Sequence, residues 1–149
     1  SMSKPGNFWV RIGTPLSHVV EQVGGIPEDT GKIVAGGPMM GRALFSLEVA
    51  VAKGTSGLLF IPSAEAYRKK VENCIRCAKC VFSCPMGLEP YLLMNFGEKM
   101  LWEEMEKNQV LDCIECGSCS FICPSHRPLL DYIKNGKVAI NNIKINSNN

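Results

Sequence analysis

The first half of the chain lacks cysteine, since all eight cysteines of the 149 residues lie after position 73. We therefore expect that half to fold without disulfides or thiolate-bound metal. The chain also lacks a large excess of charge of either sign, because it has 16 Lys and Arg and 14 Asp and Glu. No basic run is interleaved with aromatic residues. This pattern argues against nucleic-acid binding. No apolar run approaches the roughly 20 residues of a membrane helix, so we expect no direct membrane span.

The chain shows no signal peptide before its cysteines. Ser1-Met2 is typical of a tag-cleavage scar, and residues 1–5 are interpreted as a tag remnant and lead-in. The next residues lead abruptly into a β-rich run. We therefore expect an excised piece of a longer protein.

The eight cysteines form one motif that occurs twice in the chain. The first copy, Cys74 to Pro85, has the spacing C-x2-C-x2-C-x3-C-P, and the second runs from Cys113 to Pro124. Each cysteine of the second copy follows its counterpart by 39 positions, as Cys113 follows Cys74. This run is typical of proteins that hold two 4Fe–4S clusters.

The spacing also predicts which cysteines share a cluster. The first three of each motif surround one cluster from a tight loop, while the fourth, which precedes a proline that turns the chain, binds the other cluster. The first cluster is expected to take Cys74, Cys77, Cys80 and Cys123. The second is expected to take Cys113, Cys116, Cys119 and Cys84. We predict no catalytic residue, and no cofactor-binding residue beyond these eight.

Three other uses of these cysteines compete with this interpretation. Structural zinc needs only two C-x2-C pairs, which leaves the third cysteine and the proline of each motif unexplained. Disulfides suit a secreted chain, and C-x2-C pairs are poor bridges in a reducing compartment. A redox-active C-x2-C needs one pair beside a βαβ unit.

The first half, residues 6–62, reads as a small α+β domain compatible with a β-grasp. A helix is expected from Thr14-Pro15, with the threonine as N-cap and the proline at the first helical position. Gly36–Gly41 fits neither phosphate-binding glycine motif, so it is interpreted as a tight turn. The strands are expected at residues 8–12, 32–35, 48–52 and 57–61.

The second half reads as helical. Residues 63–73 are expected to form a connecting helix capped by Pro62-Ser63, and Glu89-Pro90 to open a further helical stretch between the motifs. A last helix is expected from Leu129 to about Gly136, before a frayed polar tail at residues 141–149. Four residues inside the cysteine loops are expected to cover the clusters with apolar surface: Val81, Phe82, Phe121 and Ile122.

These residues together resemble the C-terminal part of the RnfC subunits of Rnf electron-transport complexes. The resemblance covers roughly residues 6–140. Ala78 stands where a glycine is expected. The matching segments are residues 11–15, 36–41, 53–57, 74–77, 84–88, 113–119 and 127–130.

The resemblance implies two domains: an SLBB-like β-grasp domain over residues 6–62 and an α-helical two-cluster ferredoxin domain over residues 74–140. It also implies an electron relay through two 4Fe–4S clusters, in a ferredoxin:NAD oxidoreductase coupled to ion transport. FMN and NAD(H) would bind an upstream domain that this sequence lacks. The partners would be other Rnf subunits, including a ferredoxin-like one. The chain would lie on the cytoplasmic face of the bacterial inner membrane, as a peripheral subunit held by its partners.

Two other functions remain open at this point. The related RnfC-like cobalamin reductase of diol utilisation shares the same motifs. A zinc-stabilised binding module without redox activity would use the same cysteines. Broad absorbance near 400 nm that dithionite bleaches would indicate iron–sulfur clusters and exclude zinc.

Overall fold

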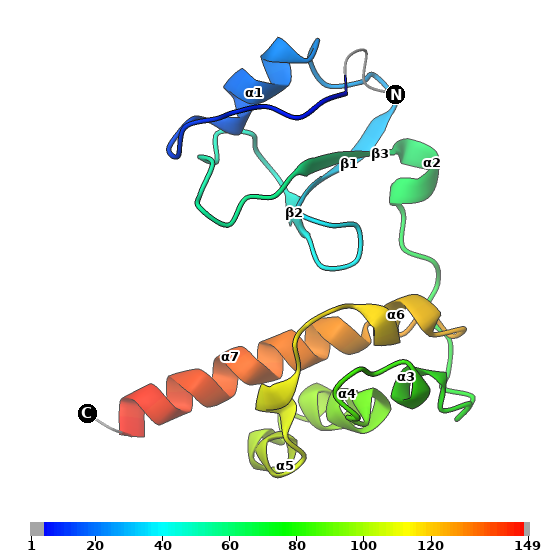
Figure 1. The fold of residues 1–149 in the computed structure, drawn as a ribbon. Coiled ribbons are helices and arrows are strands. Elements are labelled where there is room, and N and C mark those ends of the chain that lie inside the picture. Colours follow the sequence, from blue (N-terminus) through cyan, green and yellow to red (C-terminus); the bar gives the residue numbers. More distant parts are fainter. Residues whose placement is uncertain (1–4, 148–149) are drawn as a thin grey trace. The chain divides into compact units, whose positions relative to one another are not determined.

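The computed structural model describes residues 5–147 (Figure 1). The expected tag remnant at Ser1-Met2 and the last two residues of the expected tail lie outside the described residues. The chain divides into two compact units, with the boundary between Arg68 and Lys69. The first unit is mixed and the second is helical, so the α+β class predicted from the sequence is confirmed.

The first unit is built on a three-stranded antiparallel sheet with the order β2-β1-β3. β1 (Thr30–Ala35) is the central strand, and Ile33 pairs with Leu44 of β2 (Arg42–Leu44) and with Phe60 of β3 (Leu58–Pro62). The helix α1 (Leu16–Gln22) buries Leu16 and Val20.

Two of the four expected strands are wrong. Residues 8–12 have strand-forming side chains but form no strand, because no neighbouring strand pairs with them. Trp9 is fully exposed. Residues 48–52 contribute only the isolated bridge of Ala50 to Pro15. β2 was not expected, because three residues are too few for a strand pattern.

The start of α1 also differs from expectation. Pro15, not Thr14, is the N-cap, and no side chain caps the helix. The irregular segment that follows β2 takes over this role, because the amide of Leu16 donates to the Val49 carbonyl (2.9 Å) and that of Ser17 to the Leu47 carbonyl (3.0 Å).

The connecting helix is much shorter than expected. α2 covers only Ser63–Ala66, and residues 67–78 carry no helix. The hydroxyl and amide of Ser63 both donate to the Asp29 carbonyl, which fixes the start of α2 against β1. The three consecutive basic residues that follow, Arg68 to Lys70, have no apolar face to bury, so tertiary packing does not extend the helix.

The glycine-rich loop between β1 and β2 is a structural turn. Gly36 has a φ of 104°, and the amide of Gly41 donates to the Gly37 carbonyl at 2.7 Å. A Cβ on Gly41 would lie 2.6 Å from the Gly37 oxygen and 2.8 Å from the Ala35 oxygen. Met39 and Met40 are exposed. The loop therefore needs glycine at position 36 for its positive φ and at position 41 for close backbone approach.

We expect Gly41→Ala to destabilise the first unit by about 1–3 kcal/mol, because the added methyl group meets backbone atoms that cannot move aside. Chemical denaturation followed by amide exchange in residues 16–62 measures this. Gly37→Ala is the matched control, since a Cβ there meets nothing within 4 Å. Equal losses of stability in the two variants would contradict the steric explanation.

The second unit repeats one backbone pattern at the offset of the cysteine motifs. Each copy has a cysteine loop, a short helix and a longer helix. α3 (Lys79–Phe82) is followed by α4 (Pro90–Glu98), and α6 (Ser118–Ile122) is followed by α7 (Leu129–Ser147). The starts of the two short helices, and those of the two long helices, each lie 39 positions apart. The repeat therefore extends beyond the cysteines.

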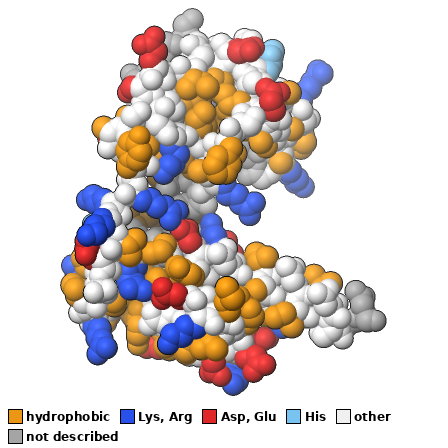
Figure 2. Space-filling model, turned by 180° about the vertical axis from the view of Figure 1, so that it is seen from behind, with side chains coloured by type: hydrophobic (Ala, Val, Ile, Leu, Met, Phe, Trp, Pro, Cys, Tyr) orange, Lys and Arg blue, Asp and Glu red, His pale blue; other side chains and the backbone are white. Residues whose placement is uncertain are grey.

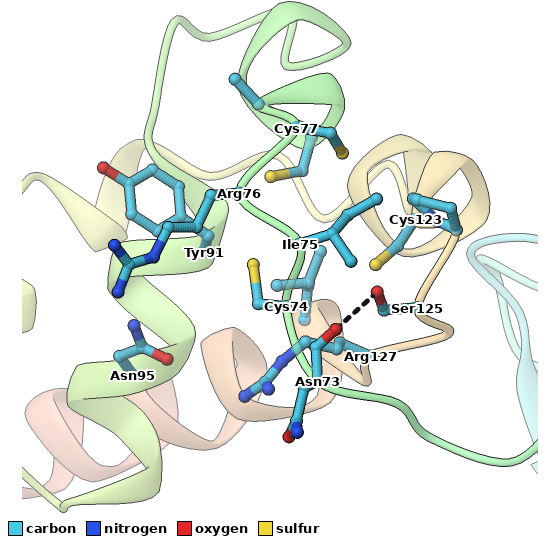
Figure 3. A pocket seen from close by; sticks show the side chains of 14 residues that line it. Asn73, Cys74, Ile75, Arg76, Cys77, Tyr91, Asn95, Cys123, Ser125 and Arg127 are labelled. Carbon is cyan, nitrogen blue, oxygen red and sulfur yellow. Dashed lines mark hydrogen bonds between the residues drawn. The ribbon is translucent and has the colours of Figure 1, made fainter.

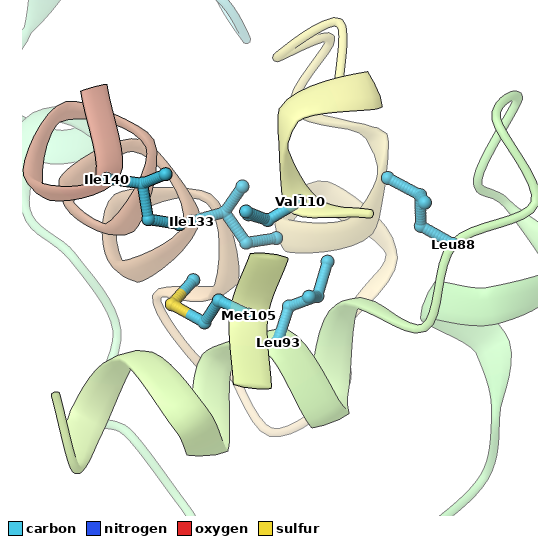
Figure 4. Close-up of a cluster of buried hydrophobic side chains, with 6 residues drawn as sticks. All are labelled: Leu88, Leu93, Met105, Val110, Ile133 and Ile140. Carbon is cyan, nitrogen blue, oxygen red and sulfur yellow. The ribbon is translucent and has the colours of Figure 1, made fainter. Parts of the chain in front are cut away.

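The two long helices enclose the core of this unit with α5 (Trp102–Lys107) and the 3-10 turn η1 (Val110–Asp112). The expected helix at Glu89-Pro90 is confirmed, with Pro90 in its first turn, but it ends at Glu98 and Met100 turns with a φ of 56°. The core cluster consists of Leu88, Leu93, Met105, Val110, Ile133 and Ile140 (Figure 4).

The expected end of α7 at Gly136 is wrong, and so is the frayed tail up to residue 147. Gly136 is buried, and a Cβ there would lie 2.5 Å from the Met105 sulfur. This glycine thus allows α5 to approach α7 closely and does not end the helix. Ile140 is buried one turn later and holds the continuation on the core.

The face of the second unit that Figure 2 shows carries interspersed side chains of both signs. This distribution agrees with the small net charge of the chain. Within residues 5–147, no helix combines the length and apolarity that crossing a membrane requires.

Candidate metal centres

Four cysteines from both motifs line one cavity of about 670 Å³ in the second unit: Cys74, Cys77, Cys80 and Cys123. This is the set expected for the first cluster. Three of them come from the first loop and α3, and the fourth from the end of α6 (Figure 3). Arg76 and Arg127 also line the cavity, and the Arg76 side chain lies on the same side of Cys74 as Tyr91 and Asn95.

Hydrogen bonds hold the two distant parts of this site together. The Ser125 hydroxyl donates to the Asn73 carbonyl at 2.9 Å, and the Glu72 amide donates to the Ser125 carbonyl at 3.0 Å. Ser125 is buried. These bonds join the residue before Cys74 to the segment that follows Cys123, so the fourth thiol is delivered to the first loop.

The other four cysteines line a second cavity, of about 20 Å³: Cys84, Cys113, Cys116 and Cys119. This is the set expected for the second cluster. The remaining residues that line the cavity are uncharged, and Leu88, Leu130 and Ile133 provide apolar walls. Cys119 is buried, whereas Cys74 and Cys77 of the first set are exposed. The second site is therefore the more enclosed of the two.

Left-handed backbone shapes both cysteine loops. Arg76 and Ala78 have φ of 55° and 56°, and their repeat partners Glu115 and Gly117 have 58° and 82°. Two left-handed residues between the cysteines curl each loop, which turns successive thiols toward one side. The glycine expected at position 78 thus has a conformational reason, because alanine is strained there.

Ala78→Gly is expected to stabilise the second unit by about 0.5–1 kcal/mol, because it relieves a strained left-handed residue at the cost of some chain entropy. Thermal denaturation of the iron-loaded protein measures the change. Gly117→Ala is the reciprocal control and should lower stability. A loss of stability in Ala78→Gly would show that position 78 is not strained.

Burial changes the acidity of several thiols. It raises the pKa of Cys119 to about 11 and raises the pKa values of Cys80 and Cys113. The pKa of Cys116 is lowered, chiefly by hydrogen bonding to the side chain of Ser118. Because thiolates are the ligands of iron, binding of metal must displace protons from the buried thiols.

The number and chemical type of the donors fit 4Fe–4S clusters. Each cavity presents four thiols, one for each iron, and each set draws three from one motif and one from the other. Among residues 5–147, no three His, Cys, Asp or Glu side chains are close enough to share a single metal ion. Thiol ligands of a cluster surround a larger volume than those of one ion. The first cavity offers more room than the second. The walls of the second cavity would have to move apart to admit a cluster.

The structure contradicts one expectation about the surroundings. Phe82 and Phe121 do not cover the cysteine sets, since 88% and 76% of their surfaces are exposed. They lie on short helices, α3 and α6, which turn these side chains outward. The apolar cover of the second set comes from the residues before α4 and from α7.

Three charged or polar residues near the sites were not predicted. Ser125 joins the two motifs, Arg127 lines the first cavity, and Lys137 reaches the second cysteine loop from α7. A comparison of the two repeats at the 39-residue offset, continued beyond the cysteines, would have drawn attention to Lys137. Its counterpart in the first repeat is Glu98, which has the opposite charge.

Two family models match the chain. Residues 1–43 match the SLBB domain, and residues 66–124 match the 4Fe-4S dicluster domain. The second match contains both cysteine motifs. The first covers α1, β1 and part of β2.

Similar curated proteins are C subunits of ion-translocating complexes. The chain is 41% identical over 140 residues, or 94% of its length, to the C subunit of the Na(+)-translocating ferredoxin:NAD(+) oxidoreductase complex of Acetobacterium woodii. It is 41% identical over 107 residues to the C subunit of the proton-translocating ferredoxin:NAD(+) oxidoreductase complex of Clostridium ljungdahlii. It is 43% identical over 141 residues to the C subunit of the ion-translocating oxidoreductase complex of Yersinia enterocolitica.

The chain spans about a third of the Acetobacterium protein and about a fifth of the other two (32%, 23% and 20%). The matches to the Acetobacterium and Yersinia proteins each cover 94% of this chain, and both cysteine motifs lie in the dicluster match. The chain therefore belongs to the family of these Rnf-type C subunits, as a segment with an SLBB domain followed by a 4Fe-4S dicluster domain.

Proposed function

We propose that this chain relays electrons through two 4Fe–4S clusters within an ion-translocating ferredoxin:NAD oxidoreductase complex. The observation that carries the proposal is the sorting of eight cysteines into two four-thiol cavities, each shared between both motifs. When bound, each cluster supplies a carrier of one electron. The first ligand set is Cys74, Cys77, Cys80 and Cys123. The second ligand set is Cys113, Cys116, Cys119 and Cys84.

The residues of the chain hold and insulate the carriers. Ser125 keeps the fourth thiol of the first set beside its loop, and the walls from Leu88, Leu130 and Ile133 limit water at the second set. The charged surroundings differ, since Arg76 and Arg127 line only the first cavity. Two sites in one small unit provide successive steps for an electron.

The similarity to C subunits of ion-translocating complexes supports the rest of the proposal, which concerns the partners of the chain and its place in the cell. Other subunits of an Rnf-type complex, including a ferredoxin-like one, would exchange electrons with this chain, and the chain would lie peripherally on the cytoplasmic face of the bacterial inner membrane. FMN and NAD(H) would bind outside this segment. The chain alone would then carry electrons without oxidising NADH.

Iron and acid-labile sulfide per chain, measured on anaerobically purified protein, test the proposal. We expect about eight of each, with broad absorbance near 400 nm that dithionite bleaches and a reduced-cluster EPR signal. Colourless anaerobic protein that binds zinc stoichiometrically and accepts no electrons would overturn the proposal in favour of a zinc-stabilised module.

A further inference from the structure

A lysine of α7 reaches across to the second cysteine loop. The Lys137 ammonium donates a hydrogen bond to the Cys113 carbonyl at 2.7 Å and forms an ion pair with Glu115 Oε1 at 2.9 Å. Its side chain is only 19% exposed. The Lys137 ammonium therefore joins two residues of the loop to the helix. Because the lysine is mostly buried, solvent screens its ion pair with Glu115 less than it screens a surface pair.

The loop residue that Lys137 holds is strained. Glu115 has a φ of 58°, a conformation that costs a non-glycine residue roughly 1–2 kcal/mol. Lys134, one turn earlier on α7, approaches the other oxygen of the same carboxylate only to 3.8 Å. Of these two helix cations, only Lys137 lies within hydrogen-bond distance of the loop.

The first repeat has reversed charges at the same two positions. Arg76 is the counterpart of Glu115, and Glu98 on α4 is the counterpart of Lys137, each 39 positions earlier. In the described part of the chain these two do not form the equivalent pair, and Glu98 lies 3.8 Å from Arg127. The first loop is correspondingly open, with Cys74 and Cys77 exposed.

We propose that Lys137 and Glu115 form a latch that holds the second cysteine loop on α7 and makes the second metal site the slower to release iron. This inference rests on the proposed function, since it assigns Lys137 a positioning role toward the bound cluster. Release requires a chelator to reach the irons as their thiolates dissociate. A loop tied to α7 at two points restricts that access, whereas Arg76 and Glu98 do not tie the first loop to α4.

Iron release from anaerobic, fully loaded protein tests the latch. With excess ferrous-iron chelator and absorbance as the readout, wild-type protein should release its iron in two phases of equal size. Lys137→Met should accelerate the slow phase about tenfold and leave the fast phase unchanged, because the Cys113 carbonyl and Glu115 lose their shared partner. Lys134→Met is the matched control, with the same loss of charge on the same helix, and should change either phase less than twofold.

Rescue separates a latch from general packing. Lys137→Arg keeps the charge and the donors, so the slow phase should persist. Adding Glu115→Lys to Lys137→Glu should recover part of the slow phase that Lys137→Glu loses. If Lys137→Met does not fold, Glu115→Gln provides the same test, because it removes the ionic partner from the loop. Cys84→Ser should lack the slow phase altogether, which assigns that phase to the second site.

A single release phase in wild-type protein would overturn the inference, as would equal effects of Lys137→Met and Lys134→Met. Acceleration of the fast phase alone would also overturn it. These outcomes differ from failure of the proposed function, because in that case the purified protein would hold no iron to release.

Discussion

Replacing Cys84 by serine is expected to remove the cluster of the second motif, although Cys84 belongs to the first. The Cys84 thiol lines the cavity of Cys113, Cys116 and Cys119, and it does not line the cavity of Cys74. Pro85 follows it and favours a backbone that leaves the first loop. Iron per chain should therefore fall from about eight to about four in anaerobic protein.

Double variants identify which cluster has been lost. Cys84→Ser with Cys113→Ser should keep about four irons, because both substitutions affect the same cluster. Cys84→Ser with Cys74→Ser should lose nearly all iron, because one ligand of each cluster is then missing. Cys123→Ser is the matched single variant, and combining it with Cys74→Ser should again keep about four irons. The opposite pattern would show that each motif binds its own cluster, and would refute the exchange of fourth ligands.

The cysteine sets are the part of the molecule that sequence spacing describes best. Short loops between Cys74, Cys77 and Cys80 restrict the directions that their thiols can take, and the proline after Cys84 or Cys123 redirects the fourth. Such constraints act within a few residues, so they can be recognised without knowledge of the fold. The helix α4 was predictable for the same reason, since Pro90 and an apolar face are local features.

Features that depend on distant residues were predicted poorly. Gly136 looks like a helix end in sequence, but Met105 packs against it from α5, and only the fold shows this contact. Residues 8–12 have strand-forming side chains but no partner strand. The roles of Ser125 and Lys137 likewise depend on segments 52 and 24 positions away. Tertiary packing decided these cases against local propensity.

Removing the iron is expected to unfold the second unit and leave the first folded. All eight cysteines belong to the second unit, where the four thiols of each site connect the loop before α3 or α6 to the other motif. Ligation supplies much of the stability of small metal domains, so chelation removes these cross-links and leaves the buried thiols without a metal to bind. Amide exchange before and after anaerobic chelation measures the effect.

The structure predicts an order for the loss of protection. Residues 72–90 and 112–128 should exchange first, because they contain the cysteine loops and the short helices α3 and α6. The α4, α5 and α7 core around Leu93, Met105 and Ile133 should follow, since it retains apolar contacts that need no metal. β1 and β3 of the first unit should keep their protection. Equal loss in both units would show that the first unit depends on the metal sites for its folding, contrary to its separate sheet and buried α1 face.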